Sequence, residues 1–148
     1  MNARRFGPAI ILALLLAPQV FADSGNVIRV KMHRDPKHSM IAIDCRINGA
    51  VRRYACVIDS GATRTIVSEK ILKAEGPATD VTTANGVIHV HEREVLFTLA
   101  EGLDLKSRVF VQSESMPADV EVLLGQDVLR QFRSVIFDYE NEQVEFRR

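Results

Sequence analysis

The chain has 148 residues, of which 47% are hydrophobic and 26% charged, so it can build one domain with a substantial core but not two. Lys plus Arg and Asp plus Glu both total 19, which gives no basic excess for nucleic-acid binding and no acidic excess typical of a disordered tail. Two Cys without a Cys-x-x-Cys pair, and four scattered His, offer no zinc ligand set. We therefore expect no metal and no cofactor, and chemistry carried by oxygen-bearing side chains.

Residues 1–22 are predicted to form a secretory signal peptide. Two arginines precede an apolar stretch from Ala9 to Leu16, and Ala22 stands at the minus-one position of a cleavage site. The apolar stretch is shorter than the roughly 20 residues that a bilayer core requires, so the mature form should have no stable membrane span. Residues 23–148 would then be a single periplasmic or secreted domain, with membrane attachment by an uncleaved signal as the alternative.

The mature chain begins with segments that are typical of short β-strands. Val27 to Met32 alternates apolar and charged side chains and ends in a polar turn. Met40 to Ile47 alternates again, Asn48-Gly49 tolerates positive φ, and Val51 to Ile58 is rich in β-forming residues. These three segments predict a strand followed by a hairpin.

The two cysteines, Cys45 and Cys56, fall on the two arms of this hairpin. They face each other if the turn is centred near Ala50-Val51, and they are diagonal neighbours if it is centred one residue earlier. A diagonal pair is a poor geometry for a disulfide, so the bond is not expected even though an oxidising compartment would permit it.

A short helix and a second hairpin are predicted next. Ser68 can cap a helix from Glu69 to Ala74, which Gly76-Pro77 would end. Val81 to Val90 contains Asn85-Gly86 near its middle, which favours a hairpin with an exposed tip.

The remaining elements complete a mainly β chain. Glu94 to Leu99 and Lys106 to Val111 are predicted strands, and a second helix should run from about Gln126 to Phe132. Val135 to Phe146 reads as two strands that turn at Glu140-Asn141. The sequence thus predicts a β-dominated fold with one or two short helices.

The candidate chemistry lies in the segment Val57-Ile58-Asp59-Ser60-Gly61-Ala62-Thr63. It places a carboxylate at the end of a hydrophobic strand, with a glycine that permits a tight turn and apolar neighbours that make the acid sensitive to a second charge. An Asp before Ser-Gly can also be a turn residue that only caps its own loop. The triplet by itself is therefore not specific.

This segment resembles the catalytic motif of the retropepsin-like aspartic proteases, in particular their small secreted bacterial group. Thr83-Ala84-Asn85-Gly86 is similar to the family's segment between the catalytic loop and the flap, and Val122 to Leu129 is similar to its apolar-apolar-Gly motif before the C-terminal helix. The motifs occur in the family's order, and the resemblance spans roughly residues 27 to 146. It implies a retropepsin-like closed β-barrel, which is half of an acid-protease fold.

The resemblance also implies roles for individual residues. It implies that Asp59 is catalytic and that a homodimer supplies the second carboxylate, because no other Asp in the chain is followed by Thr or Ser and then Gly. The implied substrate is a peptide or protein. The supporting residues are Ser60, Gly61, Ala62, Thr63 and Gly125 in the catalytic loop and its neighbour, and Thr83, Ala84, Asn85 and Gly86 in the flap.

Three function classes remain at this stage. The main interpretation is an endopeptidase that uses general acid-base catalysis without a covalent intermediate. The alternative is a non-catalytic periplasmic binding or assembly module with the same fold. A phosphatase with Asp59 as nucleophile is disfavoured, because position 61 is Gly where that chemistry normally has a second acid.

Overall fold

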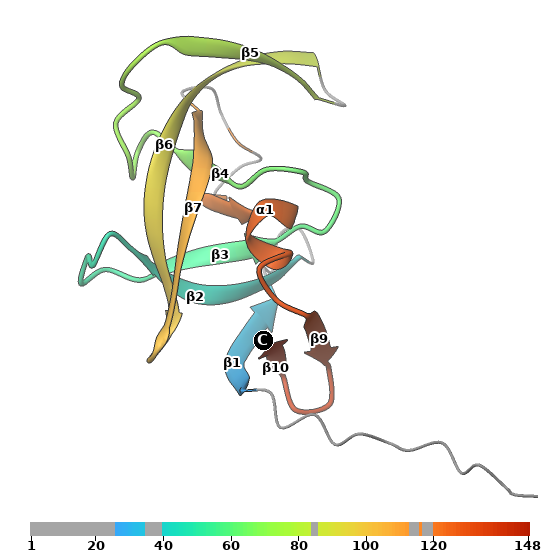
Figure 1. Ribbon diagram of the computed structural model, residues 1–148. Helices are drawn as coiled ribbons and strands as arrows, with labels where there is room; N and C mark the ends of the chain where they lie inside the picture. The colour runs from blue at the N-terminus through green and yellow to red at the C-terminus, as the bar shows by residue number, and fades with distance from the viewer. Residues whose placement is uncertain (1–25, 35–39, 84–85, 113–115, 117–119) are drawn as a thin grey trace, which may run out of the picture.

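β-Strands make up most of the architecture (Figure 1). The structure, a computed structural model, describes residues 26–34, 40–83, 86–112, 116 and 120–148. The predicted signal peptide lies outside the described residues, among which no helix is long and apolar enough to cross a membrane. The elements are β1 (Val27–Arg34), β2 (Ile41–Ile47), β3 (Tyr54–Ile58), β4 (Ile66–Ser68), β5 (Ala78–Thr83), β6 (Gly86–Ala100), β7 (Leu103–Gln112), β8 (Val122–Leu124), α1 (Gln126–Leu129), β9 (Ser134–Asp138) and β10 (Gln143–Arg147).

Six of these strands close into a barrel. The strand order includes β6-β7-β4-β8-β3-β2, and β2 pairs back onto β6 through Arg46↔Thr98 and Ile47↔Phe97. β8 lies between β3, to which it is parallel, and β4, to which it is antiparallel. The expected closed-barrel fold is confirmed, with α1 as its single α-helix in the described part of the chain.

Two additions extend the sheet beyond the barrel. The first half of β6 pairs with β5, and in Figure 1 this hairpin arches over the top of the body. At the other end, β1, β10 and β9 form an antiparallel three-stranded sheet. Both hairpins, β5–β6 and β9–β10, were predicted from turn residues between alternating segments.

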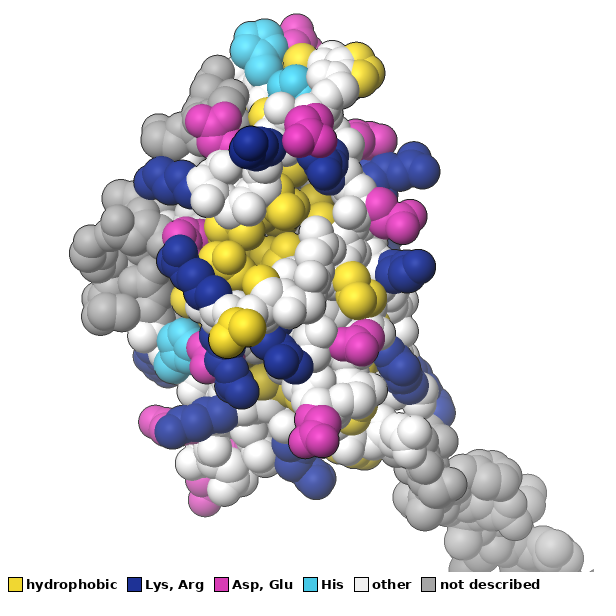
Figure 2. All heavy atoms as spheres, turned by 90° about the vertical axis from the view of Figure 1, so that its left-hand side faces the viewer, with side chains coloured by type: hydrophobic (Ala, Val, Ile, Leu, Met, Phe, Trp, Pro, Cys, Tyr) yellow, Lys and Arg dark blue, Asp and Glu magenta, His cyan; other side chains and the backbone are white. Residues whose placement is uncertain are grey.

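The barrel interior is filled by branched aliphatic and aromatic side chains. Phe97 and Phe146 are the largest of the fully buried ones, and the ring of Phe146 lies 4.7 Å from that of Phe132. The contact between Phe132 and Phe146 packs the turn after α1 against β10. On the face shown in Figure 2, basic and acidic side chains are interspersed around an apolar area. The equal numbers of the two signs are thus also mixed in space on this face.

The predicted helix from Glu69 to Ala74 is wrong. The amides of Ile71 and Leu72 both donate to the carbonyl of Ser68, at 2.9 and 3.2 Å, and the chain makes one turn only. Six residues barely suffice to nucleate a helix, and a residue before Pro, here Gly76, disfavours helical backbone. The helix expected from Gln126 to Phe132 exists but ends earlier, at Leu129, because the chain must turn into β9.

The disulfide between the two cysteines, possible but not expected from the sequence, is present. Cys45 pairs in register with Tyr54, and Cys56 pairs with Ile43, so the two are the diagonal neighbours considered above. Their Cα atoms are 5.9 Å apart, and a disulfide joins them. This separation lies within the usual range for a disulfide, so the pleat and twist of the hairpin allow a bond that register alone disfavours.

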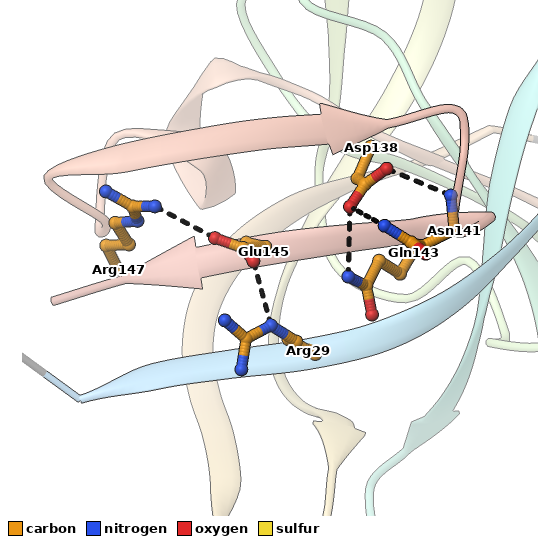
Figure 3. Close-up of polar contacts among 6 residues, drawn as sticks. All are labelled: Arg29, Asp138, Asn141, Gln143, Glu145 and Arg147. Atoms are coloured by element: carbon orange, nitrogen blue, oxygen red, sulfur yellow. Dashed lines mark hydrogen bonds and ion pairs between the residues drawn. The ribbon is translucent and has the colours of Figure 1, made fainter.

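Buried and half-buried carboxylates hold the three-stranded sheet together (Figure 3). Glu145 on β10 accepts hydrogen bonds from Arg147, at 3.0 Å, and from Arg29 on β1, at 2.8 Å. These two contacts lower the pKa of Glu145 below its ordinary value of 4.5. The pKa of Asp138 is lowered as well, chiefly by the side chain and backbone amide of Asn141 and then by Gln143.

The lowered pKa of Glu145 predicts a pH-dependent stability. A depressed folded-state pKa stabilises the protein above the ordinary value of 4.5, and the stabilisation is lost as pH falls through the folded value. We expect Glu145→Gln to lower the free energy of unfolding at pH 7 and to reduce its decline between pH 5 and 3, as measured by urea denaturation. Glu140→Gln removes the same charge from the exposed turn of this hairpin and should leave both quantities nearly unchanged. Identical pH profiles for wild type and Glu145→Gln would contradict the prediction.

Candidate active site

Asp59 stands directly after β3, at the point where that strand meets β8. Its amide donates to the carbonyl of Leu124 at 3.0 Å, which continues the parallel pairing of the two strands by one step. The side chain then turns back on its own loop: Oδ1 accepts from the amides of Gly61, at 2.8 Å, and Ala62, at 3.2 Å. The carboxylate is partly buried and is fixed through one of its oxygens.

The two carboxylate oxygens of Asp59 differ in their hydrogen bonds. Oδ2 makes no hydrogen bond within the described residues. By contrast, Asp127 uses both of its oxygens on protein donors, and so do Asp138 and Glu145. An aspartate that only caps a turn would also use Oδ1 in this way, and the exposed Asp104 likewise accepts a side-chain hydrogen bond through Oδ1 alone. What distinguishes Asp59 is the combination of one unused oxygen with a place at the junction of β3 and β8.

The loop after Asp59 is held by the residues that follow β8. The amide of Gln126 donates to the carbonyl of Ala62 at 2.8 Å, and its side-chain amide donates to the carbonyl of Ser60 at 2.8 Å. Ser60 therefore supports the loop through its backbone, while its own side chain is exposed, as is that of Thr63. Gln126 thus holds the loop at two positions, through the carbonyls of Ser60 and Ala62.

A buried polar network anchors the end of the same loop. Thr65 is fully buried, and both its amide and its hydroxyl donate to Oδ1 of Asp127, at 2.9 and 2.6 Å. The Thr65 hydroxyl also accepts from the amide of Gly125 at 3.0 Å, and Ser107 reaches Oδ2 of Asp127 at 3.4 Å. Because every one of these donors has an acceptor, the network can lie in the interior without an unpaired group.

Gly125 belongs to this network for a steric reason. A Cβ atom at position 125 would lie 2.5 Å from the carbonyl carbon of Arg64 and 2.6 Å from its oxygen. Both contacts are with backbone, which cannot move aside as a flexible side chain can. Glycine therefore permits β8 to approach the loop closely enough for the Thr65 hydrogen bonds to form.

A second apolar cluster packs against the loop outside the barrel core. It consists of buried and partly buried side chains on β2, β3, β4 and β8 and in the segments beside them, and one of its members is Ala62. Ala62 also donates its backbone amide to Asp59, so this cluster borders the Asp59 loop. The cluster contains Met40, Ala42, Val57, Ala62, Ile66, Met116, Val120 and Leu123.

Two of the four predicted flap residues, Thr83 and Gly86, lie at the end of β5 and the start of β6. Thr83 pairs with Gly86, whose φ is +119°, and the Thr83 hydroxyl donates to the carbonyl of Gly86 at 2.9 Å. Ala84 and Asn85 lie outside the described residues. The structure thus brings Asp59, Ser60, Gly61, Ala62 and Gly125 together in one loop cluster and places Thr83 and Gly86 on a separate hairpin.

Sequence reasoning missed Thr65, Gln126 and Asp127. Thr65 and Asp127 are 62 positions apart, and no local pattern connects residues at such a distance. Gln126 and Asp127 follow the apolar-apolar-Gly motif directly, so two polar residues just after a buried glycine were the available signal. Among the described residues, no group of three or more His, Cys, Asp or Glu is arranged to hold a metal ion.

Comparison with known proteins agrees with this geometry. The profile of the gag-polyprotein putative aspartyl protease family matches residues 43–131, which include Asp59, Gly125 and Asp127. The chain belongs to this family. No match was found among curated proteins.

A solved structure supports the fold of this aspartyl protease family member. The crystal structure of a retropepsin-like aspartic protease from Rickettsia conorii matches with a TM-score of 0.56 and 16% sequence identity. The match covers 83% of this chain and 94% of that one. The family resemblance seen in the sequence and the retropepsin-like fold are thereby confirmed.

The buried threonine should matter for stability far more than an exposed one. Thr65→Val keeps the shape of the side chain but leaves the Gly125 amide without its acceptor and removes the hydroxyl donor to Asp127. We expect a loss of about 1–3 kcal/mol in the free energy of unfolding, measured by urea denaturation. Thr98→Val breaks a similar contact, from Thr98 Oγ1 to Asp104 at 2.6 Å, in an exposed place, and should cost less than about 0.5 kcal/mol. Equal losses in the two variants would refute the role of the buried network.

Proposed function

We propose that this chain is an aspartic endopeptidase that acts as a homodimer, with one Asp59 from each chain at a shared site. The observation that carries the proposal is the carboxylate of Asp59, which is fixed through Oδ1 and keeps Oδ2 without a hydrogen bond in the described part of the chain. Membership of an aspartyl protease family supports the same conclusion. One such loop per chain supplies one carboxylate, so the second must come from a partner copy.

Two carboxylates at hydrogen-bond distance share one proton, because like charges so close cannot both be ionised. The ionised Asp59 takes a proton from a water molecule while the water oxygen forms a bond to the scissile carbonyl carbon. The protonated Asp59 of the other chain donates to the carbonyl oxygen. These transfers give a tetrahedral diol and leave one proton on the pair. When the C–N bond breaks, the protonated carboxyl gives its proton to the leaving nitrogen, and the other carboxylate takes a hydroxyl proton from the diol as the carbonyl forms again, so the pair is once more singly protonated.

The loop contacts described above fit this chemistry. Gly61 and Ala62 direct their amides at one oxygen and thereby fix the orientation of the carboxylate before a substrate arrives. The apolar cluster that includes Ala62 would limit the access of water to the site. It would also favour a peptide substrate with apolar side chains next to the scissile bond. The β5–β6 hairpin, with Thr83 and Gly86 near its end, is proposed to cover the bound peptide as a flap.

We also propose that residues 1–22 direct the chain to the periplasm or the outside of the cell, with residues 23–148 as the mature domain. The disulfide between Cys45 and Cys56 supports this, because disulfides persist in oxidising compartments and are rare in the cytosol.

Replacing Asp59 tests the catalytic role directly. Asp59→Asn keeps an acceptor for the loop amides but cannot take a proton from water, so cleavage of a denatured protein substrate should fall by about 10²- to 10⁴-fold. Circular dichroism and thermal unfolding should show an intact fold. Asp44→Asn changes an exposed aspartate on β2 and should retain wild-type activity. Cleavage by Asp59→Asn at the wild-type rate would eliminate the assignment and favour a non-catalytic binding or assembly module.

Sharing of the site between two chains has its own test. Activity needs the singly protonated pair, so it should fall on the acid side, where both carboxyls are protonated, and on the basic side, where both are ionised. Activity per chain should also drop on dilution into the range where sedimentation shows monomer. Adding excess Asp59→Asn chain to a fixed amount of wild type should inhibit it, because mixed dimers hold only one competent carboxylate. A rate per chain that is constant through the monomer range would show that one chain suffices.

A further inference from the structure

The β5–β6 hairpin leaves the barrel at a defined point on β6. β5 pairs with β6 from Thr83↔Gly86 back to Ala78↔His91, and Glu92 is the next residue. Glu92 already pairs with Phe110 on β7, within the barrel. Val90 and His91 pair with both β5 and β7, so the hairpin joins the barrel over this two-residue overlap, and Glu92 is the first residue of β6 beyond the β5 pairing. A contact at Glu92 therefore acts at the root of the hairpin.

Arg64 connects this root to the loop that carries Asp59. It directly precedes Thr65, which is locked into the buried network with Asp127. The Arg64 guanidinium lies over the ring of Phe110, 4.9 Å from its centre, and donates to Oε1 of Glu92 at 3.0 Å. One side chain thus joins the catalytic loop to β6 and β7.

The surroundings of the guanidinium favour a fixed position. The Arg64 side chain is only 34% exposed, and its Nε atom is buried with no hydrogen-bond partner among the described residues. The group is therefore held by the flat ring below it and by Glu92. The other oxygen of Glu92 lies 3.7 Å from Arg108, which keeps that carboxylate in place between two cations.

The opposite face of the hairpin root is anchored to a different segment. Successive residues of a strand point to opposite faces, so Arg93 lies on the side away from Glu92. Its guanidinium donates to the carbonyl of Lys73 at 3.0 Å and to Glu75 at 2.8 Å. The chain between β4 and β5 is tied to the root on that face. Toward the Asp59 loop, Arg64 adds a side-chain tie to the backbone bond from the Phe110 amide to the Thr65 carbonyl, at 2.9 Å.

We propose that Arg64 is a positioning residue that sets the β5–β6 hairpin relative to Asp59 by acting through Glu92. This rests on the proposed function in one respect, namely that the hairpin covers the substrate. An exposed ion pair by itself contributes little stabilisation. Here the guanidinium also stacks on the ring of Phe110, and one orientation of the Arg64 side chain satisfies both contacts. The contact would align the Asp59 loop with the β5–β6 hairpin, two segments that are far apart in the chain.

Hydrogen exchange followed by mass spectrometry tests the coupling without any need for activity. In Arg64→Met, the amides of β5 and of residues 86–91 should exchange about three- to tenfold faster than in wild type, because the root is less restrained. Glu92→Gln should produce a similar increase. The double variant should exchange no faster than Arg64→Met, because both residues act through one contact.

The chain offers a closely matched control. Arg52 donates to Glu121 at 3.1 Å and lies over the ring of Tyr54 at 4.8 Å, so it makes the same kinds of contact away from the hairpin. Arg52→Met should leave exchange in the hairpin unchanged. Unchanged exchange in Arg64→Met, or an equal increase in Arg52→Met, would overturn the proposal.

Kinetics provide a second readout once a peptide substrate is in hand. Arg64→Met should raise KM about three- to tenfold and leave kcat within about twofold, because the hairpin contributes to holding the peptide. A fall in kcat with KM unchanged would overturn the positioning role. If wild type cleaves no peptide, the proposed function fails, while the exchange experiment still decides whether Arg64 couples the loop to the hairpin.

Discussion

The close approach of Gly125 to the backbone of Arg64 and Thr65 is the constraint on which the rest of the site depends. It allows β8 to lie between β3 and β4, which closes the barrel and places Asp59 at a junction of two strands. It also brings Asp127 within reach of the buried Thr65. The position of β8, the closure of the barrel and the geometry of the Asp59 loop therefore depend on one another, and a side chain at position 125 would disturb all three.

The carboxylates of the described residues differ in how far their oxygens are occupied by protein donors. Glu145 is held by Arg29 and Arg147, which stabilise its ionised form. Asp127 takes its hydrogen bonds from backbone amides and hydroxyls and locks two loops together. Asp59 is oriented through one oxygen only, and under the proposed function its second oxygen would meet the water molecule and the carboxyl of the partner copy.

Sequence reasoning was successful where structure is local. The three hairpins predicted from the sequence have alternating segments and turn residues, and the motif around Asp59 indicated the family. The short strands β4 and β8 were missed, because three residues buried on all sides show no period. The helix after Ser68 was predicted wrongly because a capping residue such as Ser68 can also begin a single turn that does not continue as a helix. Thr65 and Asp127 could not be paired, since their contact depends on how β8 inserts.

A single chain satisfies the hydrogen bonds of the Asp59 loop, but under the proposed function it supplies only one of the two carboxylates that the site needs. The fold can therefore be stable before the proposed active site is complete, because the network of Thr65, Gly125 and Asp127 lies within one chain. Under the proposed mechanism, stability and activity then respond to different variables: stability to the buried network, and activity to the concentration of chains. Such a separation would allow the protein to fold and reach its compartment without cleaving its surroundings, and association would create the site where the chain accumulates.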